Sequence, residues 1–163
     1  MRPIALLLVG LALAACSNSD PKALTDEGSR KLGAGDAKAA LESFDEALAR
    51  MTPESAEFVR ASMGRFQALA RLEPARTKNE FLAFQAARPT AVKDMDFKLV
   101  VDELVKRGNF EPATDLVAAG QKAFPESQLI QQLLKSVGDA AKASKDPEAM
   151  KKLKGMGYVG DDG

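Results

Sequence analysis

The side chains that carry out chemistry in most enzymes are scarce in this chain of 163 residues. It contains no histidine, which removes the commonest general base and the commonest metal ligand. Cys16 is the one cysteine, so the chain forms neither an internal disulfide nor a cysteine-based zinc site. The remaining candidates for a chemical role are the Cys16 thiol and single carboxylates such as that of Glu54. What each could do is indicated by the sequence around it.

The thiol of Cys16 follows an apolar segment at the start of the chain. Met1 and Arg2 supply positive charge, and residues 4–15 are apolar. As a helix, such a segment rises about 18 Å, well short of the roughly 30 Å hydrocarbon core of a bilayer. The segment is therefore typical of a secretory signal peptide rather than of a membrane span.

The end of this segment, Leu13-Ala14-Ala15-Cys16, resembles the lipobox of bacterial lipoproteins. The resemblance implies that residues 1–15 are removed and that Cys16 becomes the lipid-modified first residue of the mature chain, carrying palmitate or similar acyl chains. Two acyl chains suffice for stable membrane anchoring. By that family's sorting rule, Ser17 implies the outer membrane of a Gram-negative host, with the protein facing the periplasm. An ordinary signal peptide with a chance cysteine is the alternative.

Residues 16–20 form a short polar tether after this segment, and Pro21 stands where a first helical turn starts. The stretch from Cys16 to Pro21 spans at most about 20 Å even when extended. We therefore expect the folded domain to lie close to the bilayer.

Charge and composition exclude several classes of function. The chain has 23 basic and 23 acidic residues, and no cluster of Lys and Arg suggests a phosphate-binding stripe. We therefore expect no nucleic-acid partner. Alanine, leucine, lysine and glutamate dominate, which favours helix over sheet. No cofactor, metal ion or small-molecule substrate is expected, and the protein is not predicted to be an enzyme.

A turn followed by an amphipathic helix is the most informative pattern in the chain. Gly35 tolerates the unusual backbone angles of a tight turn, and Asp36 is suited to cap the helix that follows. The apolar residues of this helix recur on one face: Ala40, Leu41, Phe44, Ala47 and Leu48. Small alanines beside the large phenylalanine indicate two closely packed helices.

This run resembles the second helix of a tetratricopeptide repeat. The turn returns as Gly108-Asn109-Phe110, 73 residues later, about two repeats of 34 plus a small insertion. The motif's small, large, small and proline positions follow it: Ala113, Val117, Gly120 and Pro125. The resemblance implies an all-α protein, built as a short right-handed helical-hairpin solenoid of about three repeats plus a capping helix. It covers residues 21–157, and residues 158–163 form a tail.

Apolar periodicity and helix breakers predict the individual helices. They cover residues 21–34, 37–51, 54–72, 74–88, 91–107, 126–143 and 147–153, with one more between Phe110 and Pro125. The pair at 54–88 lacks the glycine turn and is interpreted as a degenerate repeat, and 126–143 is the expected cap. Beyond them, Tyr158 and Val159 either pack back on the last helix or belong to a tail that engages another protein.

Tetratricopeptide proteins commonly bind a peptide or a partner's helix on a concave face lined by the first helix of each pair. By that family's register, the inward polar positions here are Thr25, Ser29, Lys98, Asp102 and Lys106. The alternative for each of these five positions is an ordinary exposed helix residue without a binding role. The lipobox and the repeats together imply a lipid-anchored cell-envelope adaptor that binds other proteins.

Two other functions remain open. One is a peptidoglycan-binding or peptidoglycan-cleaving helical envelope protein, since such enzymes resemble one another in a Glu-Ser segment and Glu54-Ser55 is such a pair. The Gly-Leu-Met-Gln segment that accompanies it is absent, and an acidic residue is also expected in a first helical turn. The other is a cap or spacer that only stabilises a larger complex.

Overall fold

The computed structural model describes residues 20–158, which are all-helical and contain no strand. The helices are α1 (Pro21–Gly33), α2 (Ala37–Leu48), α3 (Ala56–Leu72), α4 (Pro74–Ala87), α5 (Asp94–Val105), α6 (Phe110–Ala123), α7 (Gln128–Ala143) and α8 (Pro147–Gly155). The predicted all-α class is confirmed. The apolar segment, Cys16 and Val159 lie outside the described residues.

A tight turn that contains a glycine precedes α2 and another precedes α6, as the sequence predicts. Gly35 adopts a φ of 90° and Gly108 a φ of 73°, a left-handed conformation that costs glycine little. After the first turn, the carboxylate of Asp36 caps α2 by accepting a hydrogen bond from the amide of Ala39 at 3.0 Å. Both hairpins α1–α2 and α5–α6 therefore close through the same backbone device.

The start of α3 differs from the prediction. Ser55 is the N-cap, and its hydroxyl accepts a hydrogen bond from the amide of Phe58 at 3.2 Å. The helix consequently begins at Ala56 rather than at Glu54. Glu54 precedes the cap and is exposed, so it does not occupy the first helical turn in which the sequence placed it.

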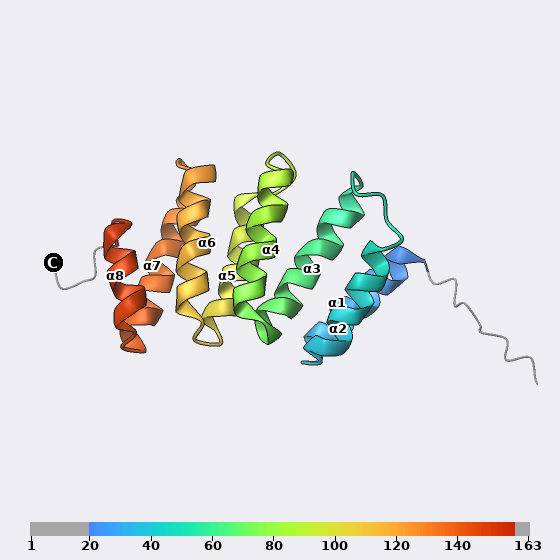
Figure 1. Ribbon diagram of the computed structural model, residues 1–163, viewed down its shortest axis with the longest axis horizontal. Coiled ribbons are helices and arrows are strands. Elements are labelled where there is room, and N and C mark those ends of the chain that lie inside the picture. The colour runs from blue at the N-terminus through green and yellow to red at the C-terminus, as the bar shows by residue number, and fades with distance from the viewer. Residues whose placement is uncertain (1–19, 159–163) are drawn as a thin grey trace, which may run out of the picture.

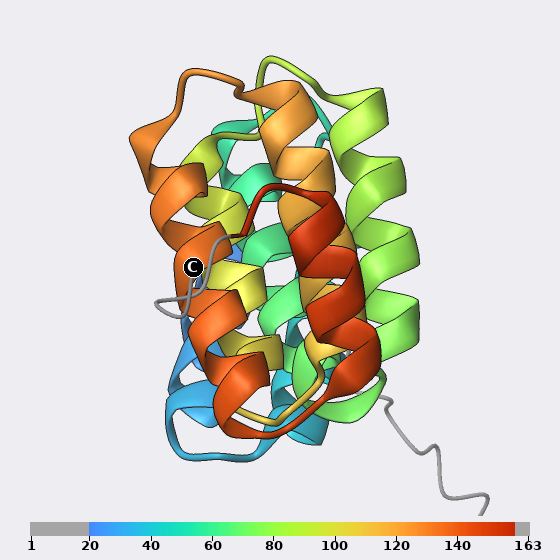
Figure 2. The same cartoon turned by 90° about the vertical axis from the view of Figure 1, so that its left-hand side faces the viewer.

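The helices pack in two rows (Figure 1). In the odd row, α1, α3, α5 and α7 contact one another in that order, and in the even row α4 contacts α6 and α6 contacts α8. Figure 2, seen from the α8 end, shows the two rows side by side. Helix α2 packs mainly on α1 and α3, so the even row has no tight contact between α2 and α4.

Phe44 of α2 fills a notch between glycines of α1 and α3. Its side chain is fully buried. A Cβ added to Gly28 would lie 2.9 Å from the ring, and one added to Gly64 would lie 2.4 Å from it, closer than real Cβ atoms come. Only glycine therefore permits this approach of the three helices. A small apolar cluster surrounds the ring, separate from the main core: Leu32, Ala37, Ala40 and Ala68.

The main core runs from α3 to the C-terminal end of the described chain. Edge-to-face contacts between phenylalanine rings connect α3, α4, α5 and the end of α6. The ring centroids of Phe66 and Phe81 lie 5.4 Å apart, those of Phe81 and Phe97 4.9 Å, and those of Phe97 and Phe124 5.9 Å. Each such pair adds about 0.5–1.5 kcal/mol beyond its buried area.

Tyr158 closes the C-terminal end of this core. A Cβ added to Gly138 of α7 would lie 2.2 Å from the tyrosine ring, so the ring lies directly on the helix backbone. The hydroxyl donates a hydrogen bond to the carboxylate of Asp139 at 2.8 Å. Tyr158 therefore packs on α7, whereas the sequence left open either packing on the last helix, 147–153, or a tail that engages another protein.

The notch around Phe44 makes Gly64→Ala a test of the fold. The added methyl group collides with a buried ring that has no space to move into, so we expect a loss of about 1–3 kcal/mol in the free energy of unfolding. Urea unfolding followed by circular dichroism measures it. Gly33→Ala is the matched control, since nothing lies within 4 Å of its added Cβ. It is expected to change stability by less than about 0.5 kcal/mol, and equal effects of the two substitutions would contradict the notch.

Candidate protein-binding surface

The structure separates the five predicted binding residues into two groups. Thr25 and Ser29 lie on α1, whereas Lys98, Asp102 and Lys106 lie on α5 or directly after it. The Thr25 side chain is only 1% exposed, and its hydroxyl donates to the carbonyl oxygen of Pro21 at 2.9 Å. Thr25 is therefore a packing residue of α1 and not part of an accessible surface.

Ser29 is exposed, but its hydroxyl is also used within α1. It donates to the carbonyl oxygen of Thr25 at 2.9 Å. Such bonds to the preceding turn are typical of serine and threonine inside helices. The α1 pair thus offers no cluster of polar groups directed at a ligand.

The α5 residues line a hollow between α5 and α7. Lys98 and Asp102 form an ion pair one helical turn apart, and both face this hollow. Its volume is about 190 Å³. Helix α7 supplies the rest of the lining: Leu129, Gln132, Leu133 and Ser136. The structure therefore places two of the predicted residues at one concavity of the odd row.

Exposed apolar side chains adjoin this hollow on α5. In residues 20–158, three large apolar side chains are exposed, and two of them are Met95 at 52% and Leu99 at 38%. They lie one helical turn apart, on the side of α5 opposite the buried Phe97 and Val101. We call Met95, Lys98, Leu99, Asp102 and Lys106 together the α5 surface.

Met95 and Leu99 were not among the binding residues predicted from the sequence. The signal was present, because both fall off the apolar face on which the other large residues of this helix recur. An apolar residue on the polar side of an amphipathic helix has no partner within its own hairpin. An exposed apolar patch beside charged groups is typical of a protein-binding surface.

A half-buried arginine, Arg71, connects α5 to the N-terminal half of the odd row. Arg71 of α3 donates to both carboxylate oxygens of Glu103, at 2.9 and 3.3 Å, and to the carbonyl oxygen of Leu32 at 2.7 Å. That carbonyl lies in the last turn of α1, where backbone acceptors lack intrahelical partners. Lys106 also reaches Glu103, at 3.4 Å. One side chain thus connects α1, α3 and α5.

The protonation of Glu103 follows from this contact. Burial alone would raise the pKa of Glu103, but the hydrogen bonds and charge of Arg71, with the charge of Lys106, outweigh it. The pKa therefore lies below its ordinary value of 4.5. At neutral pH the carboxylate is ionised, and Lys106 is partly engaged in this pair rather than fully available to a ligand.

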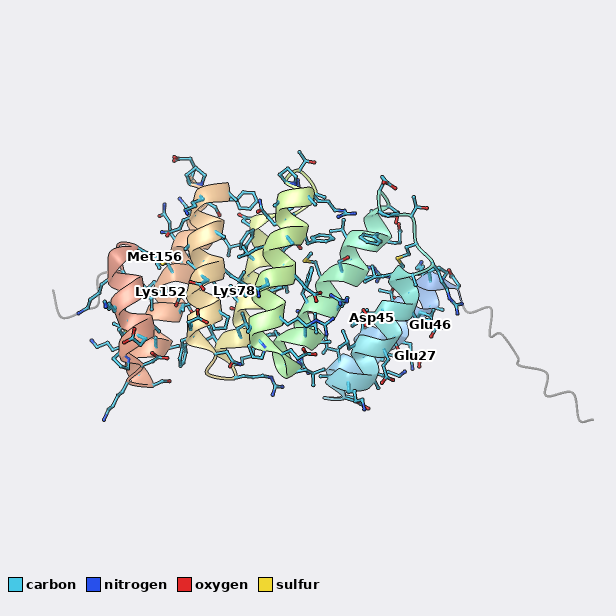
Figure 3. The ribbon with its side chains drawn as sticks, viewed as in Figure 1. Glu27, Asp45, Glu46, Lys78, Lys152 and Met156 are labelled. Atoms are coloured by element: carbon cyan, nitrogen blue, oxygen red, sulfur yellow. The ribbon has the colours of Figure 1, made fainter. Side chains whose placement is uncertain are left out.

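In the even row, surface charges add to the apolar contacts. Lys78 of α4 and Lys152 of α8 lie on the two sides of α6 (Figure 3), and both contact its acidic pair, Glu111 and Asp115. The ammonium of Lys78 lies 3.0 Å from the Asp115 carboxylate, and that of Lys152 lies 2.5 Å from it. Burial would raise the pKa of Asp115, but its hydrogen bonds to Lys152 and Lys78 lower it overall. These ion pairs connect α4 and α8 to α6.

Glu54 lies in the loop before α3 and is exposed. Within residues 20–158, no three acidic or cysteine side chains gather as metal ligands would. None of the helices in that part of the chain combines the length and apolar character that a bilayer span needs.

Fold and surface together define an all-helical protein with two packed rows and one partly apolar concavity on the odd row. No protein-family model, no curated protein and no solved structure matches this chain. Function is therefore inferred from the sequence and geometry of the chain itself.

Stability at low pH tests the Arg71–Glu103 contact. Because the folded pKa of Glu103 is lowered, its stabilising effect is complete above the unfolded value near 4.5 and is lost as the pH falls through the folded value. We expect Glu103→Gln to cost about 1–3 kcal/mol at pH 7. The variant should also lose stability less steeply than the parent below pH 4.5. Urea unfolding at several pH values measures both effects.

Glu42→Gln provides the control for this experiment. Glu42 is exposed, and no ion pair of its carboxylate is found within residues 20–158. Its substitution should leave both the stability at pH 7 and the acid slope close to those of the parent. A Glu103→Gln variant that behaves like this control would contradict a stabilising role for the contact.

Proposed function

We propose that this protein is a lipid-anchored adaptor of the cell envelope that binds other proteins through the α5 surface of a tetratricopeptide-like solenoid. The observation that carries the proposal is the exposure of Met95 and Leu99 beside the α5–α7 hollow. A protein partner would bury these side chains, and its polar groups would meet Lys98 and Asp102 at the edge.

The packing pattern supports the tetratricopeptide-like arrangement. Consecutive hairpins lie side by side, with α1, α3, α5 and α7 in one row. The glycine turns at Gly35 and Gly108 have matching conformations, and small residues stand where helices approach closely. Among them is Gly120, whose added Cβ would lie 3.0 Å from Ile130. On this view α7 and α8 cover the last apolar face of the solenoid.

The membrane anchor is proposed from the sequence around Cys16. The signal-like segment and the lipobox resemblance support acylation of this thiol, and Ser17 supports the outer membrane facing the periplasm in a Gram-negative host. Asp20, four residues after Cys16, caps α1. The α1–α2 hairpin would therefore lie next to the bilayer.

Substitution of the exposed apolar pair tests the binding surface. A photo-crosslinking amino acid in place of Gln132, in the α5–α7 hollow, should yield reproducible crosslinked partners in intact cells. We expect the combined Met95→Asp and Leu99→Asp substitutions to reduce this yield at least about tenfold, because the interface would bury unpaired charges. Quantitative mass spectrometry of the crosslinked products measures the yield.

Leu72→Asp is the matched control, since Leu72 is also exposed but lies at the end of α3. It should leave the crosslinked yield within about twofold of the parent. The same yield from the Met95/Leu99 variant and the control would argue against binding at the α5 surface.

Cys16→Ser tests the anchor. The parent protein should sediment with membranes and release only in detergent, since two or more acyl chains hold a protein stably in a bilayer. The variant should lose the acyl mass from its N-terminal peptide and appear in the soluble fraction. Cell fractionation and mass spectrometry measure these results. A parent protein whose N-terminus carries no acyl group would contradict the anchor while leaving the binding proposal intact.

A further inference from the structure

A second hollow lies on the other side of the molecule, where α2 and α4 fail to pack tightly against each other. Its volume is about 430 Å³, within the range of about 300–1,000 Å³ typical of ligand-binding clefts. The residues that define this aromatic hollow are Leu48 of α2, Phe58 and Phe66 of α3, Ala83 and Phe84 of α4, and Arg88 directly after α4.

The hollow follows from the interruption of the even row. Between α4 and α6, and between α6 and α8, neighbouring helices contact each other directly. Helix α2 instead follows α1 and α3, so the surface of α3 between α2 and α4 remains open at this position. In Figure 1, α3 is the helix seen between α2 and α4. The concavity therefore lies where a direct contact between α2 and α4 would otherwise continue the even row.

The floor of the hollow is aromatic. The rings of Phe58 and Phe84 stack with centroids 6.3 Å apart, and Phe66 meets Phe84 edge to face at 5.5 Å. Phe58 and Phe84 are only half-buried, whereas Phe66 is buried in the main core. Part of each of these two rings thus remains exposed, next to the buried ring of Phe66.

Arg88 lies at the edge of the aromatic floor and contacts two of its rings. Its guanidinium lies 4.9 Å from the ring centroid of Phe84 and 5.1 Å from that of Phe58, which are cation–π distances. The described part of the chain contains three half-buried arginines. Arg65 pairs with two carboxylates and Arg71 with one, but no carboxylate within residues 20–158 pairs with Arg88.

We infer that the aromatic hollow docks a segment of a partner protein in which an apolar side chain stands beside an acidic residue. The apolar side chain would cover the rings of Phe58 and Phe84, and the carboxylate would pair with the guanidinium of Arg88. The rings already fix the position of the Arg88 guanidinium. Its side chain therefore loses little conformational entropy when the ion pair forms. Ser62 and the Arg65–Glu80 pair also line the hollow and suit a polar backbone better than an acyl chain.

This surface is independent of the α5 surface, because it is built from α2, α3, α4 and Arg88 and shares no lining residue with the α5–α7 hollow. The two proposals can therefore fail separately. Substitutions at Met95 and Leu99 should not affect binding at the aromatic hollow, and substitutions at Arg88 should not affect crosslinking from the α5–α7 hollow.

A selection from random peptides displayed on phage tests the inference. The target is the full chain purified in lipid nanodiscs, and empty nanodiscs remove peptides that bind lipid. We expect the enriched peptides to share an apolar residue next to Asp or Glu. Synthetic copies of these peptides, measured by fluorescence anisotropy, should bind Arg88→Gln at least about tenfold more weakly than the parent.

Matched variants separate loss of the site from loss of the fold. Ala83→Tyr fills the hollow from an exposed helix position and should also weaken binding about tenfold or more, whereas Ala86→Tyr, on the same helix but outside the hollow, should not. Arg107→Gln removes an exposed arginine at another turn and should have no effect. Circular dichroism confirms that each variant is folded.

Three outcomes would overturn the inference. The first is that no peptide is enriched over empty nanodiscs, as expected if an acyl chain or a second copy of the protein occupies the hollow. The second is enrichment of peptides without an acidic residue. The third is peptide binding that Arg88→Gln and Ala83→Tyr leave unchanged.

Discussion

The packing of Phe44 between Gly28 and Gly64 is the contact on which the N-terminal half of the structure depends. Without side chains at these glycines, α1, α2 and α3 approach one another around a single buried ring. This approach brings the end of α1 within reach of Arg71, which then extends to α5. A larger residue at either glycine would separate the helices and disturb the arginine contact as well.

The two rows share one apolar core and differ in the charges that connect their helices. In the odd row, one half-buried arginine, Arg71, reaches across three helices. In the even row, Lys78 and Lys152 share Glu111 and Asp115 of α6 at the surface. Salt screens surface ion pairs much more than it weakens buried apolar contacts. High ionic strength should therefore weaken the ion pairs of the even row while leaving the shared apolar core largely intact.

Local signals in the sequence were sufficient to predict most of the helices, because periodic apolar residues and helix breakers act within a few residues of one another. The start of α3 was wrong by two residues, since a serine cap there competes with Glu54 for the role of first helical residue. Thr25 was wrong as an accessible site because the side chain bonds within its own helix and is buried there. Neither detail follows from spacing alone.

Contacts between residues far apart in the sequence could not be predicted from these local signals. Arg71 and Glu103 lie 32 positions apart, and nothing local distinguishes them from solvated charges. The same holds for Arg88, whose stacking on Phe58 depends on the angle between α3 and α4. Met95 and Leu99 were different, because their place off the apolar face is visible in the sequence once it is looked for.

The small apolar cluster around Phe44 has a consequence for the order in which the molecule opens. Only Leu41 packs against both this cluster and the main core, so opening of the α1–α2 hairpin would expose little of the interior that α4 to α8 share. Amide hydrogens of this hairpin should consequently exchange with solvent through a local opening, whereas those of α5 and α6 wait for global unfolding. The least protected part of the fold would then be its N-terminal hairpin.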